Sequence, residues 1–336
     1  MASMAKSKGK AVDLVTGATS ELGRRVAEEL VARGHEVRAV LHLNPKNAEE
    51  WKGVPAGVKP YVADLTLPAQ KDRKSLSEAC AGVDNVFHIA AAVYNYKNSV
   101  DTLMSINVVG TENLLSTIAR ANKRRECHFI FASSVSVYGY GRGGEVLTEE
   151  SEVRPKTPYS KSKYIAEQVI QSYCLANPAI KYTILRLGTI YGPGYEHPSF
   201  TKVFRMIKRG EMRYIGNGEN HLTLIHVDDA AGAFIRSMES PASLNKVYNL
   251  TDGEPHTQRR LFSIAAKYMG APPVQKSIHP ILARIARRSK HINSDEFDFL
   301  MSNRTVSIAR IRRELGFLPK ATIDIEGTEM IGRSLG

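Results

Sequence analysis

A chain of 336 residues with 43% hydrophobic and 24% charged side chains can bury one large core or two unequal ones, which excludes a largely disordered protein. No run approaches the ~18 uninterrupted apolar residues of a membrane-spanning helix, and the opening MASMAKSKGKA holds no apolar segment that could act as a secretory signal. We therefore expect a cytoplasmic protein. Its formal net charge of +12 would suit a phosphorylated cofactor, nucleic acid or a membrane surface, without choosing among them.

Two features of the sequence suggest specialised sites but have simpler interpretations. The most basic segment, ILARIARRSKH at 281–291, could separate apolar residues and cations onto two faces of a helix. We interpret it as the solvated face of an ordinary helix, and we expect neither nucleic-acid binding nor peripheral membrane contact. The three cysteines, Cys80, Cys127 and Cys174, are far apart and lack metal-ligand spacing, so we expect reduced thiols and no metal site.

From Ala11 onward, strand-like runs alternate with segments of helical period. The predicted strands are AVDLVTG (11–17), HEVRAVLHL (35–43), VKPYVADL (58–65), DNVFHIAAA (84–92), CHFIFASS (127–134) and IKYTILRLG (180–188). The predicted helices are ELGRRVAEELVARG (21–34), KSLSEACAG (74–82), a long helix from Ser99 to Asn122, and one that contains Tyr159. Parallel strands need connections of this length, so the pattern predicts a doubly wound α/β domain with helices on both faces of its sheet.

After YGPG at 191–194 the pattern changes. Helices become shorter, and the strand candidates HLTLIHV (221–227) and KVYNLT (246–251) are separated by longer irregular pieces. We therefore expect three parts. These are a flexible tail at 1–10, a dinucleotide-binding domain at 11–187, and a smaller substrate-binding lobe at 188–336, some segments of which return to the first domain.

The first strand runs into TGATSELG, which places Gly17 in a turn and Gly23 at the start of a helix. A strand, a glycine turn and a helix N-terminus together present backbone N–H groups and a positive dipole end to a pyrophosphate. The G-x-G-x-x-G pattern is absent, so this evidence depends on the position of the turn in the domain.

A second candidate is TPYSKSKYIAEQ at 157–168, where Tyr159 precedes Lys163 by four residues. Residues at this spacing share a helix face, and Pro158 suits a first helical turn. A nearby ammonium favours the phenolate, which would make Tyr159 a usable general acid or base. The pair alone is also what an ordinary helix surface contains by chance.

The order of the motifs resembles that of the extended short-chain dehydrogenase/reductases, which include NAD-dependent epimerase/dehydratases, dihydroflavonol reductases and 3β-hydroxysteroid dehydrogenases. TGATSELG is similar to their T-G-x-x-G-x-x-G fingerprint, and the resemblance continues to the tail IRRELGFLPK. The other landmarks are ADLT with Asp64, HIAAA with His88, NVVGT with Asn107, SSVSVYG with Ser134, YSKSK, RLGTIYGPG with Arg186, and IHVDDAA with Asp228 and Asp229.

The resemblance implies roles for four catalytic residues. Tyr159 would exchange a proton with a substrate oxygen while hydride passes between carbon and the nicotinamide. Lys163 would lower the pKa of the phenol and bind the nicotinamide ribose, Ser134 would hold the same substrate oxygen, and Asn107 would support a water relay. The implied cofactor-binding residues are Gly17, Thr19, Ser20, Glu21, Leu22, Gly23, His42, Asp64, Leu65, Ala90, Ala91, Tyr159, Lys163, Leu187 and Thr189.

Two departures from the family pattern bear on the cofactor. Ser20 replaces the middle glycine of the fingerprint, and its hydroxyl could donate to the phosphates. At the end of the second strand an NAD site would place a carboxylate for the ribose 2′-hydroxyl. Leu41 stands there and is followed by His42, Asn44 and Lys46. We therefore expect NADP(H) to be favoured over NAD(H).

Two absences bear on the reaction. Val135 and Ser136 follow Ser134 where dehydratases of the family carry an Asp-Glu pair, and Leu222 stands where many nucleotide-sugar enzymes carry an arginine that grips the diphosphate. Arg205 or Lys208 would have to replace that grip. The substrate contacts expected near the mouth of a partly apolar pocket are Tyr94, Tyr96, Ser134, Ser136, Tyr140 and Tyr191.

The sequence thus predicts an NAD(P)-dependent oxidoreductase acting on a carbonyl or secondary alcohol of a small, apolar or cyclic molecule. One alternative is a nucleotide-sugar 4-epimerase with tightly bound NAD. Another is a non-catalytic dinucleotide sensor or RNA-binding protein. The resemblance also implies a homodimer built on the helix from Ser99 to Asn122 and the helix after Tyr159, through Leu103, Leu114, Ile118, Ile165, Val169 and Tyr173.

Overall fold

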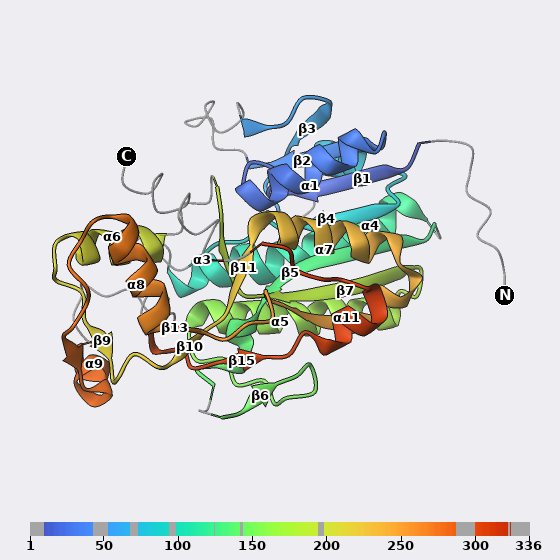
Figure 1. Cartoon of the computed structure of the whole chain (residues 1–336). Coiled ribbons are helices and arrows are strands. Elements are labelled where there is room, and N and C mark those ends of the chain that lie inside the picture. Colours follow the sequence, from blue (N-terminus) through green and yellow to red (C-terminus); the bar gives the residue numbers. More distant parts are fainter. Residues whose placement is uncertain are drawn as a thin grey trace.

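Seven parallel strands form the central sheet of the structure, which is a computed structural model (Figure 1). The structure describes residues 10–42, 53–67, 73–93, 99–123, 125–141, 144–193, 198–286, 300–321 and 323. In the sheet the strands follow the order β12-β7-β5-β4-β1-β2-β3. They are β1 (Val12–Thr16), β2 (Glu36–Leu41), β3 (Val58–Val62), β4 (Asn85–His88), β5 (Cys127–Ser134), β7 (Ile180–Leu187) and β12 (Lys246–Leu250).

Helices cover both faces of this sheet, which confirms the predicted doubly wound α/β fold (Figure 1). One face packs against α1 (Glu21–Ala32), α7 (Val227–Glu239) and α11 (Ala309–Leu315). The other packs against α2 (Arg73–Cys80), α4 (Gly110–Asn122) and α5 (Pro158–Ala176). Seven of the eight residues of β5 are buried, because a central parallel strand is shielded from water on both sides.

All three cysteines are free thiols buried in the second of these cores. Burial raises the pKa of Cys80 and of Cys174 to about 12. These thiols therefore act as small apolar side chains, as their sequence spacing indicated.

The helix predicted from Ser99 to Asn122 is interrupted. It consists of α3 (Val100–Met104), a π-helical turn (Ser105–Val109) and α4. The Gly110 N–H donates to the Ser105 carbonyl, five residues back, so the turn holds one residue more than an α-helical turn. Turns of this kind occur mostly as single insertions at functional sites, and this one contains Asn107.

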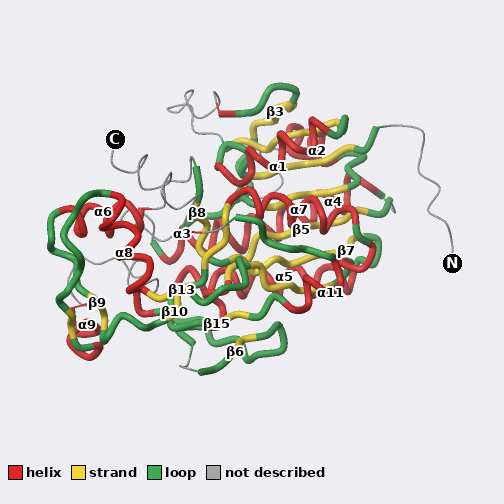
Figure 2. Tube along the Cα trace, in the orientation of Figure 1, coloured by secondary structure: helices red, strands yellow, loops and turns green. Residues whose placement is uncertain are grey.

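The rest of the chain after β7 forms short strands and helices beside the sheet, mostly on one side of the molecule (Figure 2). The predicted strand HLTLIHV is divided, because its two halves pair with different partners: β10 pairs with β13 and β11 with β8. These elements are β8 (Thr189–Tyr191), α6 (Pro198–Lys208), β9 (Tyr214–Ile215), β10 (His221–Leu222), β11 (Leu224–His226), β13 (His256–Thr257), α8 (Gln258–Tyr268), β14 (Ser277–Ile278), α9 (Pro280–Ala286) and β15 (Thr305–Val306). The last of them, β15, pairs with β6 (Val146–Leu147), which precedes β7 in the chain.

Three elements that follow residue 187 lie on the seven-stranded sheet: β12 extends its edge, and α7 and α11 pack on its face. A separate core holds Tyr191, Phe204, Leu224 and Phe262 and ties α6 to α8. The division of the chain at residue 187 into two functional lobes remains a prediction, as does the tail, most of which lies outside the described residues.

Candidate active site

The carboxyl ends of four neighbouring strands bring the predicted site residues to one edge of the sheet. In the parallel register His88 lies opposite Thr16 of β1 and opposite Phe131 of β5. Ser134, the last residue of β5, lies opposite Leu187, the last residue of β7. Ligands of open α/β sheets bind at this edge.

The turn after β1 is built for close approach of a backbone to a ligand. Gly17 adopts φ +75°, and a Cβ there would lie 2.8 Å from the Ala90 nitrogen. A Cβ on Gly23 would lie 2.0 Å from the Gly17 carbonyl oxygen, so both positions require glycine. The turn leads into the twelve-residue helix α1, whose N-terminus faces this edge and suits a phosphate. These residues fit the pyrophosphate of a dinucleotide.

Ser20 caps α1. Its hydroxyl accepts a hydrogen bond from the Gly23 N–H at 3.2 Å and donates to the Gly17 carbonyl at 2.7 Å. The hydroxyl proton of Ser20, which we expected to bond the phosphates, is therefore used inside the turn. Ser20 stabilises the turn as an N-cap. Leu22 is buried in the core and Glu21 pairs with Arg24 at 2.5 Å, so these two side chains are already engaged, whereas Thr19 is exposed in the turn.

The end of β2 holds the residues that bear on the choice of cofactor. Leu41, which stands where an NAD site would place a carboxylate, is buried in the core and faces away from solvent. The exposed residue is His42, and 63% of its side chain is accessible. Its Nε2 lies 3.8 Å from Asp64 Oδ2, while Asp64 Oδ1 accepts hydrogen bonds from Thr66. Asn44 and Lys46 lie outside the described residues.

Ser134 is the last residue of β5, and its hydroxyl oxygen accepts one hydrogen bond within the protein. The Ser136 N–H donates to Ser134 Oγ at 3.1 Å, which uses an acceptor site and leaves the hydroxyl proton available for a substrate oxygen. The hydroxyl of Ser136 is buried and has no hydrogen-bond partner within the described part of the chain. A buried, unpaired hydroxyl is costly unless a ligand or water bonds it.

Tyr159 lies in the first turn of α5, where the local sequence fixes its backbone. Thr157 caps the helix, Pro158 occupies the first helical position, and Ser160 completes a capping box. The Ser160 N–H donates to Thr157 Oγ1 at 3.1 Å, and the Thr157 N–H donates to Ser160 Oγ at 2.9 Å. These reciprocal bonds hold the start of the helix at a single entry angle.

Lys163 is buried one turn further along the same helix face. Its Nζ donates to the Ala132 carbonyl at 2.7 Å and lies 4.6 Å from the centre of the Phe131 ring. Burial lowers the pKa of Lys163 to about 7, and the Glu167 carboxylate opposes that change. Below pH 7 the side chain is thus an ammonium in a buried, preformed position, from which it can favour the phenolate of a neighbouring tyrosine.

Asn107 is buried in the π-helical turn and connects two parts of the site. Its amide nitrogen donates to the Ala92 carbonyl and to Ser162 Oγ, both at 2.9 Å, and its amide oxygen accepts from the Ala92 N–H at 2.8 Å. Ser162 Oγ donates to the Tyr159 carbonyl at 2.8 Å. Asn107 therefore links the loop after β4 to the first turn of α5.

A buried ion pair supports Lys163 from the next turn of α5. Glu167 accepts hydrogen bonds from Arg186 at 2.7 Å and from the Ser133 hydroxyl at 2.5 Å. Arg186 also donates to the Tyr138 hydroxyl at 2.8 Å, which in turn donates to Asn249 Oδ1 at 2.8 Å. The sequence had indicated Arg186 as a landmark without a role, and it missed Glu167 altogether.

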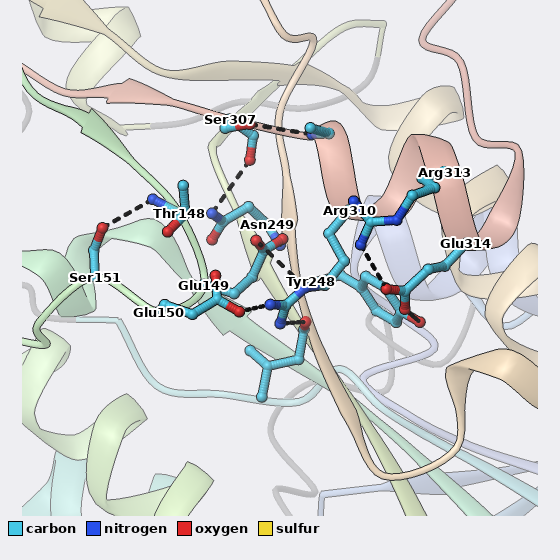
Figure 3. A network of polar contacts seen from close by, with 12 residues as sticks. Thr148, Glu149, Glu150, Ser151, Tyr248, Asn249, Ser307, Arg310, Arg313 and Glu314 are labelled. Carbon is cyan, nitrogen blue, oxygen red and sulfur yellow. Dashed lines mark hydrogen bonds and ion pairs between the residues drawn. The ribbon is translucent and has the colours of Figure 1, made fainter.

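The polar contacts continue from Asn249 into the C-terminal segment (Figure 3). The Asn249 N–H donates to Glu149 at 2.8 Å, and Arg310 of α11 pairs with Glu150. Tyr248 donates to Glu314 at 2.9 Å. Figure 3 shows these side chains joining β12, α11 and the loop after β6. The edge strand β12 is therefore held in place by α11.

The tyrosines expected as substrate contacts have different outcomes. Tyr191 is completely buried in the separate core that ties α6 to α8, with its ring 5.3 Å from that of His226, so it cannot line an open pocket mouth. A tyrosine next to a Gly-Pro turn looks the same in sequence whether it lines a pocket or fills a core. Tyr140 is partly exposed. Tyr94 and Tyr96 lie outside the described residues.

The remaining predicted cofactor residues lie on the same edge or beside it. Ala90 and Ala91 are partly exposed after β4, and Thr189 is partly exposed after β7. Leu187 is buried, and Leu65 packs against the second core beside Gly110. The side chains of Leu187 and Leu65 therefore pack inside the protein, and these two residues would contact a cofactor through their main chain.

This arrangement matches a known family. The model of the NAD dependent epimerase/dehydratase family fits residues 14–251, which is most of the chain and includes the central sheet apart from the first two residues of β1. The chain belongs to this family. The family depends on a nicotinamide dinucleotide, and the geometry of the turn after β1 fits the pyrophosphate of such a cofactor.

Curated family members and solved structures resemble the chain over most of its length. It is 31% identical to the 2-alkyl-3-oxoalkanoate reductase of Stenotrophomonas maltophilia, over 79% of this chain and 78% of the relative. It is 26% identical to the sterol-4-alpha-carboxylate 3-dehydrogenase, decarboxylating, of Dictyostelium discoideum, over 76% of each chain. The structure of MoeE5 in complex with UDP-glucose and NAD superposes with a TM-score of 0.75 at 24% identity, covering 98% of this chain and all of that one, and supports the fold.

No group of three or more His, Cys, Asp or Glu side chains in the described residues is placed to hold a metal ion. No helix in the same residues is both long and apolar enough to cross a membrane.

The lowered pKa of Lys163 predicts how stability depends on pH. The unfolded chain holds the lysine proton up to a pKa of ~10.4, whereas the folded chain releases it near pH 7. Between these values the unfolded chain binds more protons, so the penalty for burying Lys163 is full below pH 7 and disappears as the pH rises. Lys163→Met should therefore raise the melting temperature of the ligand-free protein most at pH 6, by several degrees, and least near pH 10.

The control for this measurement is Lys161→Met, which changes an exposed lysine of the same helix. Its melting temperature should follow that of the unmodified protein at every pH. A Lys163→Met difference that stays constant from pH 6 to pH 10 would show that the lysine is not buried as a cation.

Proposed function

We propose that this protein is an NADP-preferring oxidoreductase that interconverts a carbonyl and a secondary alcohol. The observation that carries the proposal is the buried Lys163 on the same face of α5 as Tyr159. Burying an amine against one carbonyl and one ring costs free energy, and folding alone gains nothing from it. Acid-base chemistry at Tyr159 would explain why the chain retains this unfavourable burial.

The reaction assigns one task to each side chain. When bound, the nicotinamide supplies or accepts the hydride at the substrate carbon. During reduction the electron pair of the C=O π bond moves to oxygen, and Tyr159 donates the proton that this oxygen takes. Ser134 donates a hydrogen bond to the same oxygen, since its acceptor site is already used by Ser136. Lys163 stabilises the phenolate left behind, and Asn107 holds the segment from which water returns the proton.

The names of two relatives point to one substrate class. A 2-alkyl-3-oxoalkanoate and a sterol-4-alpha-carboxylate oxidised at C3 share one feature: the reacting carbon is next to the carbon that bears the carboxylate. Both also carry a large apolar skeleton. We infer that this protein acts on a 3-oxo or 3-hydroxy carboxylic acid of apolar character. The unpaired hydroxyl of Ser136, two residues from Ser134, supports a second polar contact to such a substrate.

A nucleotide-sugar 4-epimerase is the alternative within the family, since MoeE5 binds UDP-glucose and NAD. Leu222, at the place of the diphosphate-gripping arginine, is fully buried and offers no charge. Arg205 and Lys208 of α6 are exposed and remain the candidates for such a grip. The intact Ser134, Tyr159 and Lys163 argue against a non-catalytic dinucleotide sensor or an RNA-binding protein. Location in the cytoplasm stays a prediction from sequence.

The direct test is turnover by Tyr159→Phe. With NADPH and a panel of 2-alkyl-3-oxoalkanoates, other ketones and UDP-sugars, we expect the unmodified protein to reduce the oxo acids fastest. Tyr159→Phe should lose ~10²-fold or more in kcat because only the transferable proton is removed, while its affinity for NADPH stays nearly unchanged. Conversion of UDP-glucose without external cofactor would favour the epimerase, and undiminished turnover by Tyr159→Phe would remove the catalytic assignment.

Cofactor choice should depend on His42. It is exposed at the end of β2, where the 2′-substituent of the ribose is recognised in this fold. We expect NADPH to bind more tightly than NADH. His42→Arg should widen the ratio of the two dissociation constants by about tenfold, because the arginine gains a charge-assisted bond to the 2′-phosphate. His42→Asp should narrow or invert the ratio, because the carboxylate repels that phosphate. Fluorescence titration with both cofactors measures the ratio, and equal ratios in the three proteins would exclude His42.

The proposed homodimer needs a revised surface. Leu103, Leu114 and Ile118 are fully buried, and the latter two pack on the sheet of their own chain, so they cannot meet a partner. The apolar residues left on this face are partly or largely exposed: Val109 at the end of the π-helical turn, and Ile165, Val169 and Tyr173 on α5. We propose that a second copy covers them through a two-fold contact.

Sedimentation equilibrium at micromolar concentration should give a mass near twice 37.1 kDa. Ile165→Glu should reduce this mass to that of one chain and lower activity, because Ile165 lies two residues from Lys163. Leu318→Glu changes an exposed apolar residue elsewhere and should leave the mass unchanged. A monomeric unmodified protein with full activity would rule out both the interface and its link to catalysis.

A further inference from the structure

A series of buried hydrogen bonds surrounds His88, the last residue of β4. His88 is 1% exposed, with Nδ1 2.8 Å from Thr16 Oγ1 and Nε2 2.9 Å from Thr111 Oγ1. Thr111 Oγ1 donates to the Asn107 carbonyl at 2.7 Å, so it must accept from His88 Nε2. His88 Nδ1 therefore accepts from the Thr16 hydroxyl, which itself accepts from the Ala90 N–H at 3.2 Å. Each hydroxyl proton and ring nitrogen in this series has one assigned partner.

This assignment requires a neutral imidazole. Burial and, to a smaller extent, the nearby Lys163 ammonium lower the pKa of His88 to about 3. A second ring proton would point at Thr16 Oγ1, whose own proton would then lose its acceptor. Packing does not demand a histidine here, because the ring lies among Phe129 and Phe131, with centroids 5.5 and 5.6 Å away. An aromatic hydrocarbon would fill the same space, so the hydrogen bonds account for the residue.

The series ends at the irregular point of the helix. Asn107 lies in the π-helical turn, where the Gly110 N–H reaches back five residues to Ser105 and the regular bonding pattern is shifted. The hydroxyl of Thr111 bonds the Asn107 carbonyl directly, four residues back. Through Thr111, His88 therefore fixes the main chain of the turn from the side of the sheet.

The side chain of Asn107 carries this constraint to the catalytic helix. Its amide group makes three hydrogen bonds, two to Ala92 and one to Ser162 Oγ. Ser162 Oγ bonds the Tyr159 carbonyl. An amide held by three partners tolerates little rotation, so a shift of the Asn107 main chain would break at least one of these bonds.

We propose that His88, kept neutral, is a positioning residue for Tyr159. It holds Asn107 through Thr111, and Asn107 in turn fixes the first turn of α5. This inference rests on the proposed function, in which Tyr159 transfers the proton, and it adds a residue that the reaction itself does not touch.

The test removes the hydroxyl of Thr111 and keeps the volume of the side chain. Thr111→Val deletes the group that accepts from His88 and donates to Asn107, and Thr111→Ser restores it. Thr117→Val is the matched control: Thr117 is buried on α4, and its hydroxyl makes the same bond to a carbonyl four residues back, that of Asn113. We expect Thr111→Val and Thr117→Val to lose similar stability. Only Thr111→Val should also lose kcat, by about tenfold or more, with NADPH affinity unchanged and with kcat recovered in Thr111→Ser.

A spectroscopic measurement that needs no substrate accompanies the kinetics. The side-chain amide of Asn107, labelled with ¹⁵N and assigned by its loss in Asn107→Asp, should give a resonance that exchanges slowly with solvent. It should shift and exchange faster in Thr111→Val and in His88→Phe, and remain unchanged in Thr117→Val. An Asn107 resonance that is unaffected in Thr111→Val would overturn the proposal.

The kinetic arm separates the two claims. If Tyr159→Phe abolishes turnover but kcat of Thr111→Val equals that of Thr117→Val, the function stands and the positioning role of His88 is wrong. If Tyr159→Phe retains turnover, the proposed function fails, and the role of His88 toward Tyr159 fails with it. Equal losses of kcat in Thr111→Val, in His88→Phe and in the variant carrying both substitutions are expected, because residues that act through one series of bonds are not additive.

Discussion

The burial of the Lys163 ammonium is the interaction on which the rest of the site depends. Water has been replaced by one carbonyl oxygen, that of Ala132, and by the face of Phe131. Such a cation is stable only where its surroundings are fixed in advance. The sheet supplies this rigidity, because Ala132 and Phe131 belong to its central strand β5, which is paired on both sides. A loop could not hold the same geometry.

The neighbouring buried groups are arranged around this one charge. Glu167 is one turn beyond Lys163 and favours its protonated form, yet it is bonded to Arg186 and Ser133 and so cannot neutralise the lysine completely. His88 stays neutral beside it and adds no second cation. Replacing a buried ion pair such as Glu167 and Arg186 with apolar residues is often neutral or stabilising. Here the pair joins α5, which carries Glu167, to β7, which carries Arg186, one turn from Lys163.

The sequence predicted those features that depend on spacing and period. Alternating apolar runs gave the parallel sheet, and the spacing of Tyr159 and Lys163 gave the shared helix face. It could not predict the π-helical turn, because inserting one residue shifts the bonding without changing composition. It could not show that Leu41 is buried while the next residue, His42, is exposed, because successive strand residues face opposite sides of a sheet. Glu167 looked like an ordinary helix residue, since its partner Arg186 lies on a distant strand.

The central claim is that Lys163 prepares Tyr159 to give up its proton, and a titration of that phenol tests it most directly. The chain has 14 tyrosines, so the ultraviolet phenolate signal of the NADP⁺-bound protein is recorded against pH and that of Tyr159→Phe is subtracted. The remaining signal belongs to Tyr159. The account predicts a pKa well below the ordinary ~10, restored toward that value in Lys163→Met. A difference signal that titrates at the ordinary value in both proteins would contradict it.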